Sequence, residues 1–232
     1  MDIKKCKQPG DNHSYHQLQS ELFGFTFAPP QYSRDRILMA NNMSLYYDPL
    51  NPTWCEYPDW FAVVGLSESL VDLPRKQGYY TWQEGRRPAM VMEFLPSQDE
   101  SAKQPSSPQQ PTAWEVYEQI LGIPFYVIFD YTTNSLQLFK LLGDRYQKQE
   151  LNNNQFWFPG LDLGLGLWSG EYQGLKRFWL RWYDSRGHWI PLPEELPSDT
   201  SASVSVEDSQ PSQTPSKLGQ HLQQLGIVTH KI

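Results

Sequence analysis

The sequence has 232 residues, of which 39% are hydrophobic and 14% aromatic, so it is long enough for one domain with a packed core. A formal net charge of −7 argues against a broad surface that coats nucleic acid, which would be basic, but it allows a local basic groove. Two cysteines exclude a disulfide framework, and there is no transmembrane-length apolar run or hydrophobic leader, so we expect a cytoplasmic protein that does not enter the membrane.

The N-terminal part predicts a tail, a cover segment and two short strands. Residues 1–20 are polar and predict a flexible tail, whereas residues 20–33 hold aromatics and a double proline and predict an ordered segment without regular structure. Residues 36–49 contain two short apolar pieces on either side of Asn41 and Asn42. Asparagine tolerates positive φ, so this pair predicts a tight turn or bend between the pieces.

Two apolar runs without alternation predict central strands that are covered on both faces. The first is WFAVVG at residues 60–65, and Asp59 stands immediately before it. The second is AMVMEFL at residues 89–95, where bounding prolines at this short length favour a strand over a short buried helix. Glu93 interrupts the second run, where a carboxylate is costly unless it is paired, hydrogen-bonded or bound to a metal.

The two acids allow a functional and a structural interpretation. On neighbouring strands, Asp59 and Glu93 would chelate a hard divalent ion such as Mg²⁺, which generates hydroxide and stabilises a phosphodiester transition state. Alternatively, Asp59 only caps a turn, while Glu93 points to a sheet edge or pairs with Arg86 or Arg87. The pattern of residues alone leaves both interpretations open.

A helix and a further strand follow a polar stretch. Residues 97–111 are rich in Ser, Gln and Pro and predict a mobile surface loop. Thr112 is a suitable N-cap with Glu115 three residues later, as in a capping box, and Gly122 ends the helix. FYVIFDY at residues 125–131 predicts another buried strand, so this part of the chain predicts a strand–helix–strand crossover unit.

The C-terminal part predicts an antiparallel meander. Residues 135–151 read as two alternating strands, residues 156–174 as an irregular Gly- and aromatic-rich segment, and residues 175–193 as a hairpin. The aromatics of residues 178–189 either stack on bases or, as alternating strand residues more often do, pack in the core. The predicted division is a flexible tail at 1–20, a domain at 21–193, a disordered Ser/Pro-rich linker at 194–216 and a short helical tail at 217–232.

Several blocks of this sequence resemble the Uma-two family of restriction-endonuclease-like proteins, in the PD-(D/E)XK nuclease superfamily. They are WCEYPDWFAVVGL, YYTWQEGRRPAMVMEFLPS, TAWEVYEQILGIPFYVIFDY and the closing GLGLW and LKRFWLRWYD, and they span roughly residues 35–195. The resemblance implies an α/β fold of the α+β type, with a mixed central sheet flanked by helices and metal-binding acids at the opened centre of the sheet. It also implies a bacterial endonuclease with DNA as its substrate and Mg²⁺, or Mn²⁺, as its cofactor.

The resemblance carries site roles over to individual residues. Asp59 and Glu93 match the catalytic, metal-binding acids, and the carbonyl oxygen of Phe94 would be a further metal ligand. The superfamily lysine two residues after the second acid is Leu95 here. The helix lysine that serves instead in this family is replaced by Ala113. Loss of such a group typically lowers a rate by roughly 10²–10⁴-fold.

Other cations are candidates for the missing charge. Lys103 in the polar loop is the candidate catalytic lysine, although ordering that loop would cost entropy. Arg86 and Arg87, just before the strand of Glu93, are candidate substrate-binding residues; otherwise they form a solvated hairpin tip.

Three functions therefore compete. The chain is a metal-dependent DNA endonuclease, a catalytically silent nuclease fold that binds DNA or a protein partner, or an assembly subunit. A homodimer is a further expectation, because nucleases that cut duplexes often dimerise to reach both strands.

Overall fold

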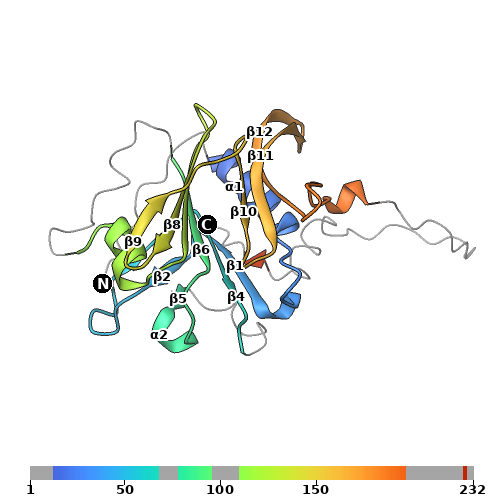
Figure 1. Ribbon diagram of the computed structural model, residues 1–232. Helices are drawn as coiled ribbons and strands as arrows, with labels where there is room; N and C mark the ends of the chain where they lie inside the picture. The colour runs from blue at the N-terminus through green and yellow to red at the C-terminus, as the bar shows by residue number, and fades with distance from the viewer. Residues whose placement is uncertain (1–12, 68–77, 96–109, 197–226, 229–232) are drawn as a thin grey trace, which may run out of the picture.

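A seven-stranded mixed sheet forms the centre of the computed structural model, which describes residues 13–67, 78–95, 110–196 and 227–228 (Figure 1). The strand order is β13-β1-β4-β6-β7-β8-β9. Strands β6 and β7 are parallel, as are β1 and β13, and the other neighbours are antiparallel. This confirms the predicted mixed central sheet. The strands are β1 Ile37–Asn41, β4 Trp60–Val64, β6 Met90–Phe94, β7 Phe125–Asp130, β8 Ser135–Leu142, β9 Arg145–Lys148 and β13 Ile227–Val228.

Two smaller sheets accompany the central one. One is the antiparallel sheet β10-β11-β12, the expected C-terminal meander, and the other has the order β3-β2-β5. Strands β1 and β2 are separated by Asn42 and Met43, and the φ of 48° at Asn42 confirms the predicted turn or bend. The strands are β2 Ser44–Tyr46, β3 Cys55–Glu56, β5 Gly78–Tyr80, β10 Gln155–Phe158, β11 Leu163–Tyr172 and β12 Leu175–Tyr183.

The prediction of irregular structure over residues 156–174 is wrong, because they form most of β10 and all of β11. The glycines of β11 weaken the sequence pattern that would indicate a strand. A Cβ atom at Gly164 would lie 1.9 Å from Cζ of Tyr183, so the missing side chain lets that ring cross the strand. In β11 glycine therefore marks close packing and not a break in the strand.

The hairpin predicted for residues 175–193 is mostly replaced by another pairing. Strand β12 pairs with β11 from Leu175 to Tyr183. The turn after it is as predicted: Asp184 accepts hydrogen bonds from the backbone N–H groups of Arg186 and His188. Beyond the turn, the predicted second strand is reduced to an isolated bridge between Tyr183 and Trp189 within the described residues.

Residues His13–Thr26 form helix α1, so the prediction of a flexible tail and of an irregular cover segment is wrong for these residues. Its residues 13–20 belong to the fold, because Tyr15 and Gln19 are buried. The Gln19 side chain donates to the carbonyl oxygen of Leu180 at 2.8 Å and accepts from its N–H at 2.9 Å, so it completes the backbone hydrogen bonds of β12. The other helical segments are η1 Arg34–Arg36, α2 Thr81–Glu84, α3 Ala113–Glu115, the π-helical η4 Val116–Ile120 and η5 Pro193–Glu195.

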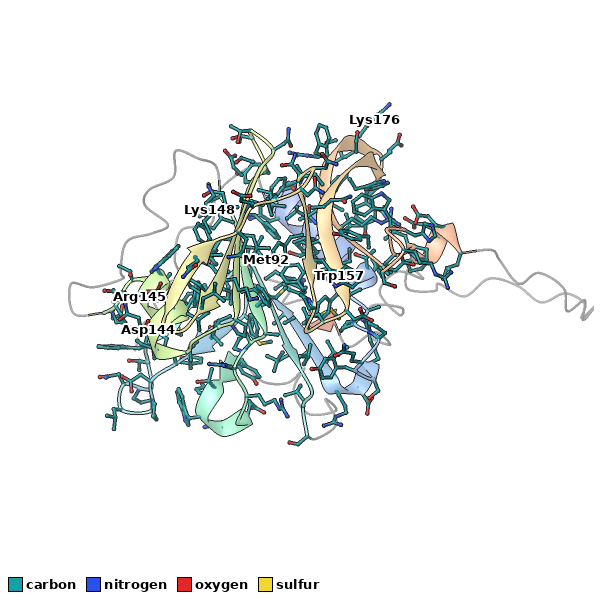
Figure 2. The ribbon with its side chains drawn as sticks, viewed as in Figure 1. Met92, Asp144, Arg145, Lys148, Trp157 and Lys176 are labelled. Carbon is teal, nitrogen blue, oxygen red and sulfur yellow. The ribbon has the colours of Figure 1, made fainter. Side chains whose placement is uncertain are left out.

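Each face of the central sheet carries its own hydrophobic cluster. In β6, Met90, Met92 and Phe94 pack with α1 and the β10-β11-β12 sheet, whereas Val91 packs on the opposite face with α3, η4 and the β3-β2-β5 sheet. Met92 is fully buried in the interior of the molecule (Figure 2). By the same alternation, Glu93 lies on the α3–η4 face of the sheet.

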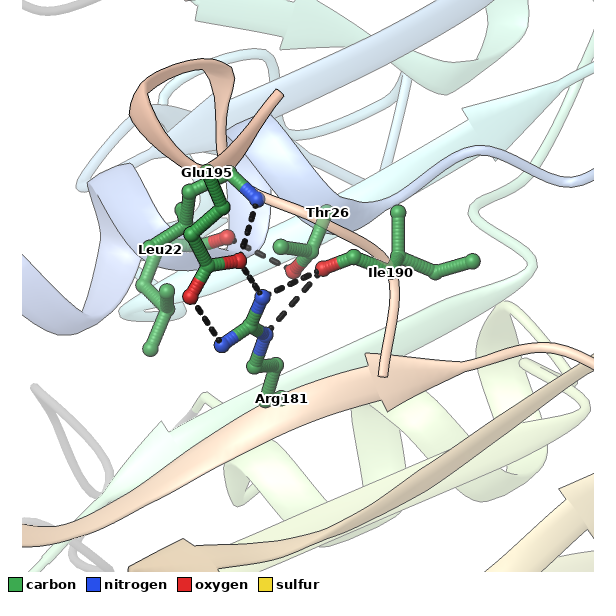
Figure 3. A network of polar contacts seen from close by, with 6 residues as sticks. Leu22, Thr26, Arg181, Ile190 and Glu195 are labelled. Atoms are coloured by element: carbon green, nitrogen blue, oxygen red, sulfur yellow. Dashed lines mark hydrogen bonds and ion pairs between the residues drawn. The ribbon is translucent and has the colours of Figure 1, made fainter. Parts of the chain in front are cut away.

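A buried arginine ties the segment after β12 to the fold (Figure 3). Arg181 donates two hydrogen bonds to the carbonyl oxygen of Ile190, at 3.1 and 2.7 Å, and pairs with the carboxylate of Glu195. The same carboxylate accepts the N–H of Leu192 at 2.8 Å. The guanidinium also stacks on Trp168, 4.6 Å from the ring centroid. These contacts fix residues 190–195 against β12.

Some predictions fall on residues outside the described ranges. These are most of the polar loop at 97–111, nearly all of the linker at 194–216 and most of the tail at 217–232. Within that tail, Ile227 and Val228 are described and form a short strand beside β1. In the described ranges, every helix is too short or too polar to cross a bilayer.

Candidate functional site

The register of β4 and β6 brings Asp59 and Glu93 together. Trp60 pairs with Met92 in this antiparallel ladder, so the residues one step further, Asp59 and Glu93, stand side by side at the end of the pairing. The N–H of Phe94 donates to Asp59 Oδ2 at 2.7 Å, which orients that carboxylate beside β6. Of the residues expected to form a site, these three meet at one end of two central strands.

Tyr117 holds the Glu93 carboxylate from the helical side. Its hydroxyl donates to Glu93 Oε1 at 3.0 Å, and its ring is fully buried. Thr112 caps α3 through the predicted capping box with Glu115. The chain then continues as the π-helical η4, which carries Tyr117. Such π-helical turns are rare and frequently occur at functional sites.

The pKa of Glu93 is raised well above its ordinary value, first by burial and then by the negative charge of Asp59. Hydrogen bonds from the Tyr117 hydroxyl and the Asp59 backbone N–H act in the opposite direction without cancelling the rise. Among the residues that the structure describes, Glu93 forms no ion pair with Lys, Arg or His. Within the described ranges, two neighbouring acids are thus held together with no Lys or Arg paired to either.

Glu56 is a third acid near this pair, and the sequence pattern does not indicate it. Burial raises its pKa to about 7, and its charge contributes to the raised pKa of Glu93. It ends β3 three residues before Asp59, in the same CEYPD block. The sequence signal for Glu56 is its position three residues before Asp59. This spacing alone does not predict that the two side chains lie at the same site.

His16 is a second site residue that the sequence pattern does not indicate, because its polar surroundings predict a tail. It lies on α1, with Nδ1 3.5 Å from Asp59 Oδ1. Its ring packs edge-on against Phe94 and Tyr131, with centroids 5.8 and 5.3 Å apart. Its Nε2 is buried and lacks a hydrogen-bond partner within the described ranges. Helix α1 therefore contributes a polar group to the same end of β4 and β6.

The candidate cations lie away from the acids. Arg86 and Arg87 are exposed and precede the N-terminal end of β6, whereas Glu93 lies near its C-terminal end. Arg87 donates to the carbonyl oxygen of Leu121 at 3.2 Å. The alternative in which either arginine pairs with Glu93 is therefore wrong. Lys103 falls in residues 96–109, which are outside the described ranges.

A cavity of about 230 Å³ adjoins Glu93. Position 113, where the sequence has alanine, forms part of its wall, so the small methyl group leaves the space beside the carboxylate open. The cavity is lined by Glu93, Leu95, Thr112, Ala113, Trp114, Tyr126 and Ile128.

The two carboxylates fit a hard divalent ion in their chemistry. In the described ranges no set of three or more His, Cys, Asp or Glu side chains is grouped to hold a metal, which does not match a closed structural zinc site. Mg²⁺ instead binds through one or two carboxylates and keeps several water ligands. A dication would also compensate the adjacent charges of Asp59 and Glu93. The donor set therefore suits Mg²⁺ or Mn²⁺.

Comparison with known families adds an independent finding. The family model Uma2, described as "Putative restriction endonuclease", matches residues 7–171. The match covers most of the chain, starts before α1 and ends within β11, and it includes Asp59, Glu93 and Ala113. A comparison with curated proteins gave no significant match.

Proposed function

Because this chain belongs to the Uma2 family, we propose that it is an endonuclease that hydrolyses phosphodiester bonds of DNA at a Mg²⁺ or Mn²⁺ ion held by Asp59 and Glu93. The observation that supports this most is the pairing of two carboxylates at the end of β4 and β6, where neither acid pairs with a Lys or Arg side chain in the described ranges and Asp59 has His16 Nδ1 at 3.5 Å. Two adjacent, partly buried carboxylates are costly unless a bound cation neutralises them.

The neighbouring groups orient the two acids. The Phe94 N–H directs one oxygen of Asp59, which leaves Oδ1 on the side of His16. The Tyr117 hydroxyl directs Oε1 of Glu93. The Phe94 carbonyl oxygen is proposed as a further ligand. When bound, the ion would lower the pKa of water and neutralise charge that develops on the phosphate.

The proposed enzyme is slowed by the residue at position 113. Ala113 stands in the cavity wall next to Glu93, so this position supplies no ammonium group to orient the attacking water or balance charge near the phosphate. Lys103 is the proposed substitute within the chain. Arg86 and Arg87 are exposed, and we propose that they contact the DNA backbone. They would provide local positive charge on a protein whose net charge is −7.

A second candidate function is a silent nuclease fold that binds DNA or a protein partner without cutting. Ala113 favours it, because loss of a positioned cation removes catalysis while the sheet and the acids remain. In both cases we propose a bacterial, cytoplasmic protein, with a homodimer as the form that reaches both strands.

Asp59→Asn tests the proposed metal site directly. The asparagine still accepts the Phe94 N–H but loses the charge, so the fold should persist while affinity for Mn²⁺ or Mg²⁺ falls strongly in calorimetric titration. Asp48→Asn is the matched control, since Asp48 caps an exposed turn by accepting hydrogen bonds from Leu50 and Asn51. An unchanged metal affinity of Asp59→Asn would sink the assignment.

A further inference from the structure

The cavity beside Glu93 has a polar end and an apolar body. Its lining holds one carboxylate, that of Glu93, and no Lys, Arg or His, while Leu95, Trp114 and Ile128 contribute apolar walls. Such a lining matches an amphipathic ligand with one charged end.

The aromatic wall is held rigidly by its own neighbours. The Trp114 and Tyr126 rings meet edge to face with centroids 5.7 Å apart. Trp114 packs in the same way on Phe139 and Tyr146, at 5.0 and 5.3 Å. The cavity is therefore part of a fixed aromatic cluster, and its shape does not depend on a single movable ring.

The charge and size of the cavity select a class of ligand. The carboxylate favours a cation, and aromatic rings nearby add to the attraction of an organic cation. A volume of about 230 Å³ is several times the roughly 30 Å³ that one water occupies in the liquid, but is smaller than a drug-sized pocket. A ligand of a few heavy atoms fits these limits.

We propose that this cavity binds a primary alkylammonium group with a stem of about three to five carbons, with its nitrogen at the Glu93 carboxylate and its stem along Trp114, Leu95 and Ile128. The group comes either from a free amine or from the side chain of a lysine. This rests on the same acid as the proposed nuclease function, but the binding itself requires neither metal nor DNA.

The test is a titration of the full chain with n-butylammonium, followed by NMR, without metal or DNA. n-Butanol, which has the same stem and no charge, is the control ligand. We expect n-butylammonium to bind in the millimolar range and at least tenfold more tightly than n-butanol. Equal binding of the two ligands, or no binding of the amine, would overturn the proposal.

Three variants locate the site and the source of the ammonium. Glu93→Gln removes the charge and Ala113→Leu fills the cavity from its wall, so each should weaken amine binding at least tenfold. Amine binding of wild-type strength by the folded Ala113→Leu variant would also overturn the proposal.

Lys103→Ala separates the two sources of the ammonium group. Tighter amine binding than in the wild type identifies Lys103 as a competing occupant, and unchanged binding identifies a free amine. Plasmid nicking, measured in parallel, tests the nuclease function separately, so failure of one does not imply failure of the other.

Discussion

The hydroxyl of Tyr117, on a π-helical turn, donates a hydrogen bond to Oε1 of Glu93, in the central sheet, across 3.0 Å. This contact connects the helical crossover to the acid that interrupts an otherwise apolar strand. It also lowers the pKa of Glu93, against the larger effects of burial and of Asp59. Through this hydrogen bond, the helical segment offsets part of the rise in the pKa of Glu93.

Tyr117→Phe removes this donor without changing the shape of the ring. The pKa of Glu93 should then rise further, because one group that favours the carboxylate is lost. Metal affinity at pH 7 should fall, and unfolding should cost about 1–2 kcal/mol less, as for a lost buried hydrogen bond. Metal titration at several pH values checks this.

Tyr146→Phe is the control for that variant. Its hydroxyl donates to the carbonyl oxygen of Ile123 at 2.9 Å, so it removes a similar buried hydrogen bond without contacting Glu93. Stability should fall to a similar degree while metal affinity stays unchanged. If both variants change metal affinity equally, the Tyr117–Glu93 contact has no special role.

Glu56→Gln should make the stability of the protein less sensitive to pH. The pKa of Glu56 is raised in the folded protein from its ordinary 4.5 to about 7 by burial. A raised pKa means that its contribution to stability is fully present below about pH 4.5 and is lost as pH rises through about 7. The variant should therefore match the wild type at pH 4 and exceed it at pH 8, by up to roughly 3 kcal/mol.

Urea unfolding of both proteins from pH 4 to pH 8 measures this effect. Glu115→Gln serves as a control of opposite sign, because hydrogen bonds from Thr112 lower the pKa of Glu115. A lowered pKa stabilises the fold above the unfolded value, so this control should be less stable than the wild type at neutral pH. A wild-type advantage over Glu56→Gln at pH 8 would contradict the burial of Glu56.

Gly164→Ala tests the packing of β11. A Cβ atom there would lie 1.9 Å from Cζ of Tyr183, so the ring or the strand must move, and overpacking of this kind costs about 1–3 kcal/mol. Gly160→Ala is the control, since nothing lies within 4 Å of a Cβ atom at that position. Thermal unfolding should show a loss for the first variant alone. Equal stability of the two variants would mean that Tyr183 does not cross β11 at Gly164.

The central strands could be predicted because their cores are continuous apolar runs. Asp59 and Glu93 stood out in the sequence because acids are rare at such positions, and the β4–β6 register brings them together as the metal-site interpretation required. The capping box of Thr112 and Glu115 was visible for a similar reason, since it depends on residues only three apart. Local rules were sufficient for these features.

Other features depend on contacts far apart in the sequence. Gln19 is buried in α1 because its amide bonds to Leu180, a partner 161 residues away, so its polarity misleadingly suggested a tail. The same error removed His16 from the expected site. Gly164 looked like a strand breaker because its partner, the ring of Tyr183, belongs to another strand. None of these partners is indicated by local periodicity.

Plasmid nicking with Mg²⁺ or Mn²⁺ tests the central claim most directly, with the wild type, Glu93→Gln and Ala113→Lys compared at equal concentration. The proposed function predicts nicking by the wild type that disappears with EDTA and in Glu93→Gln. It also predicts faster nicking by Ala113→Lys, by up to roughly 10²–10⁴-fold, because a cation then stands beside Glu93. Cleavage that persists in Glu93→Gln, or no cleavage by any of the three proteins, would contradict the claim that Asp59 and Glu93 form a nuclease site.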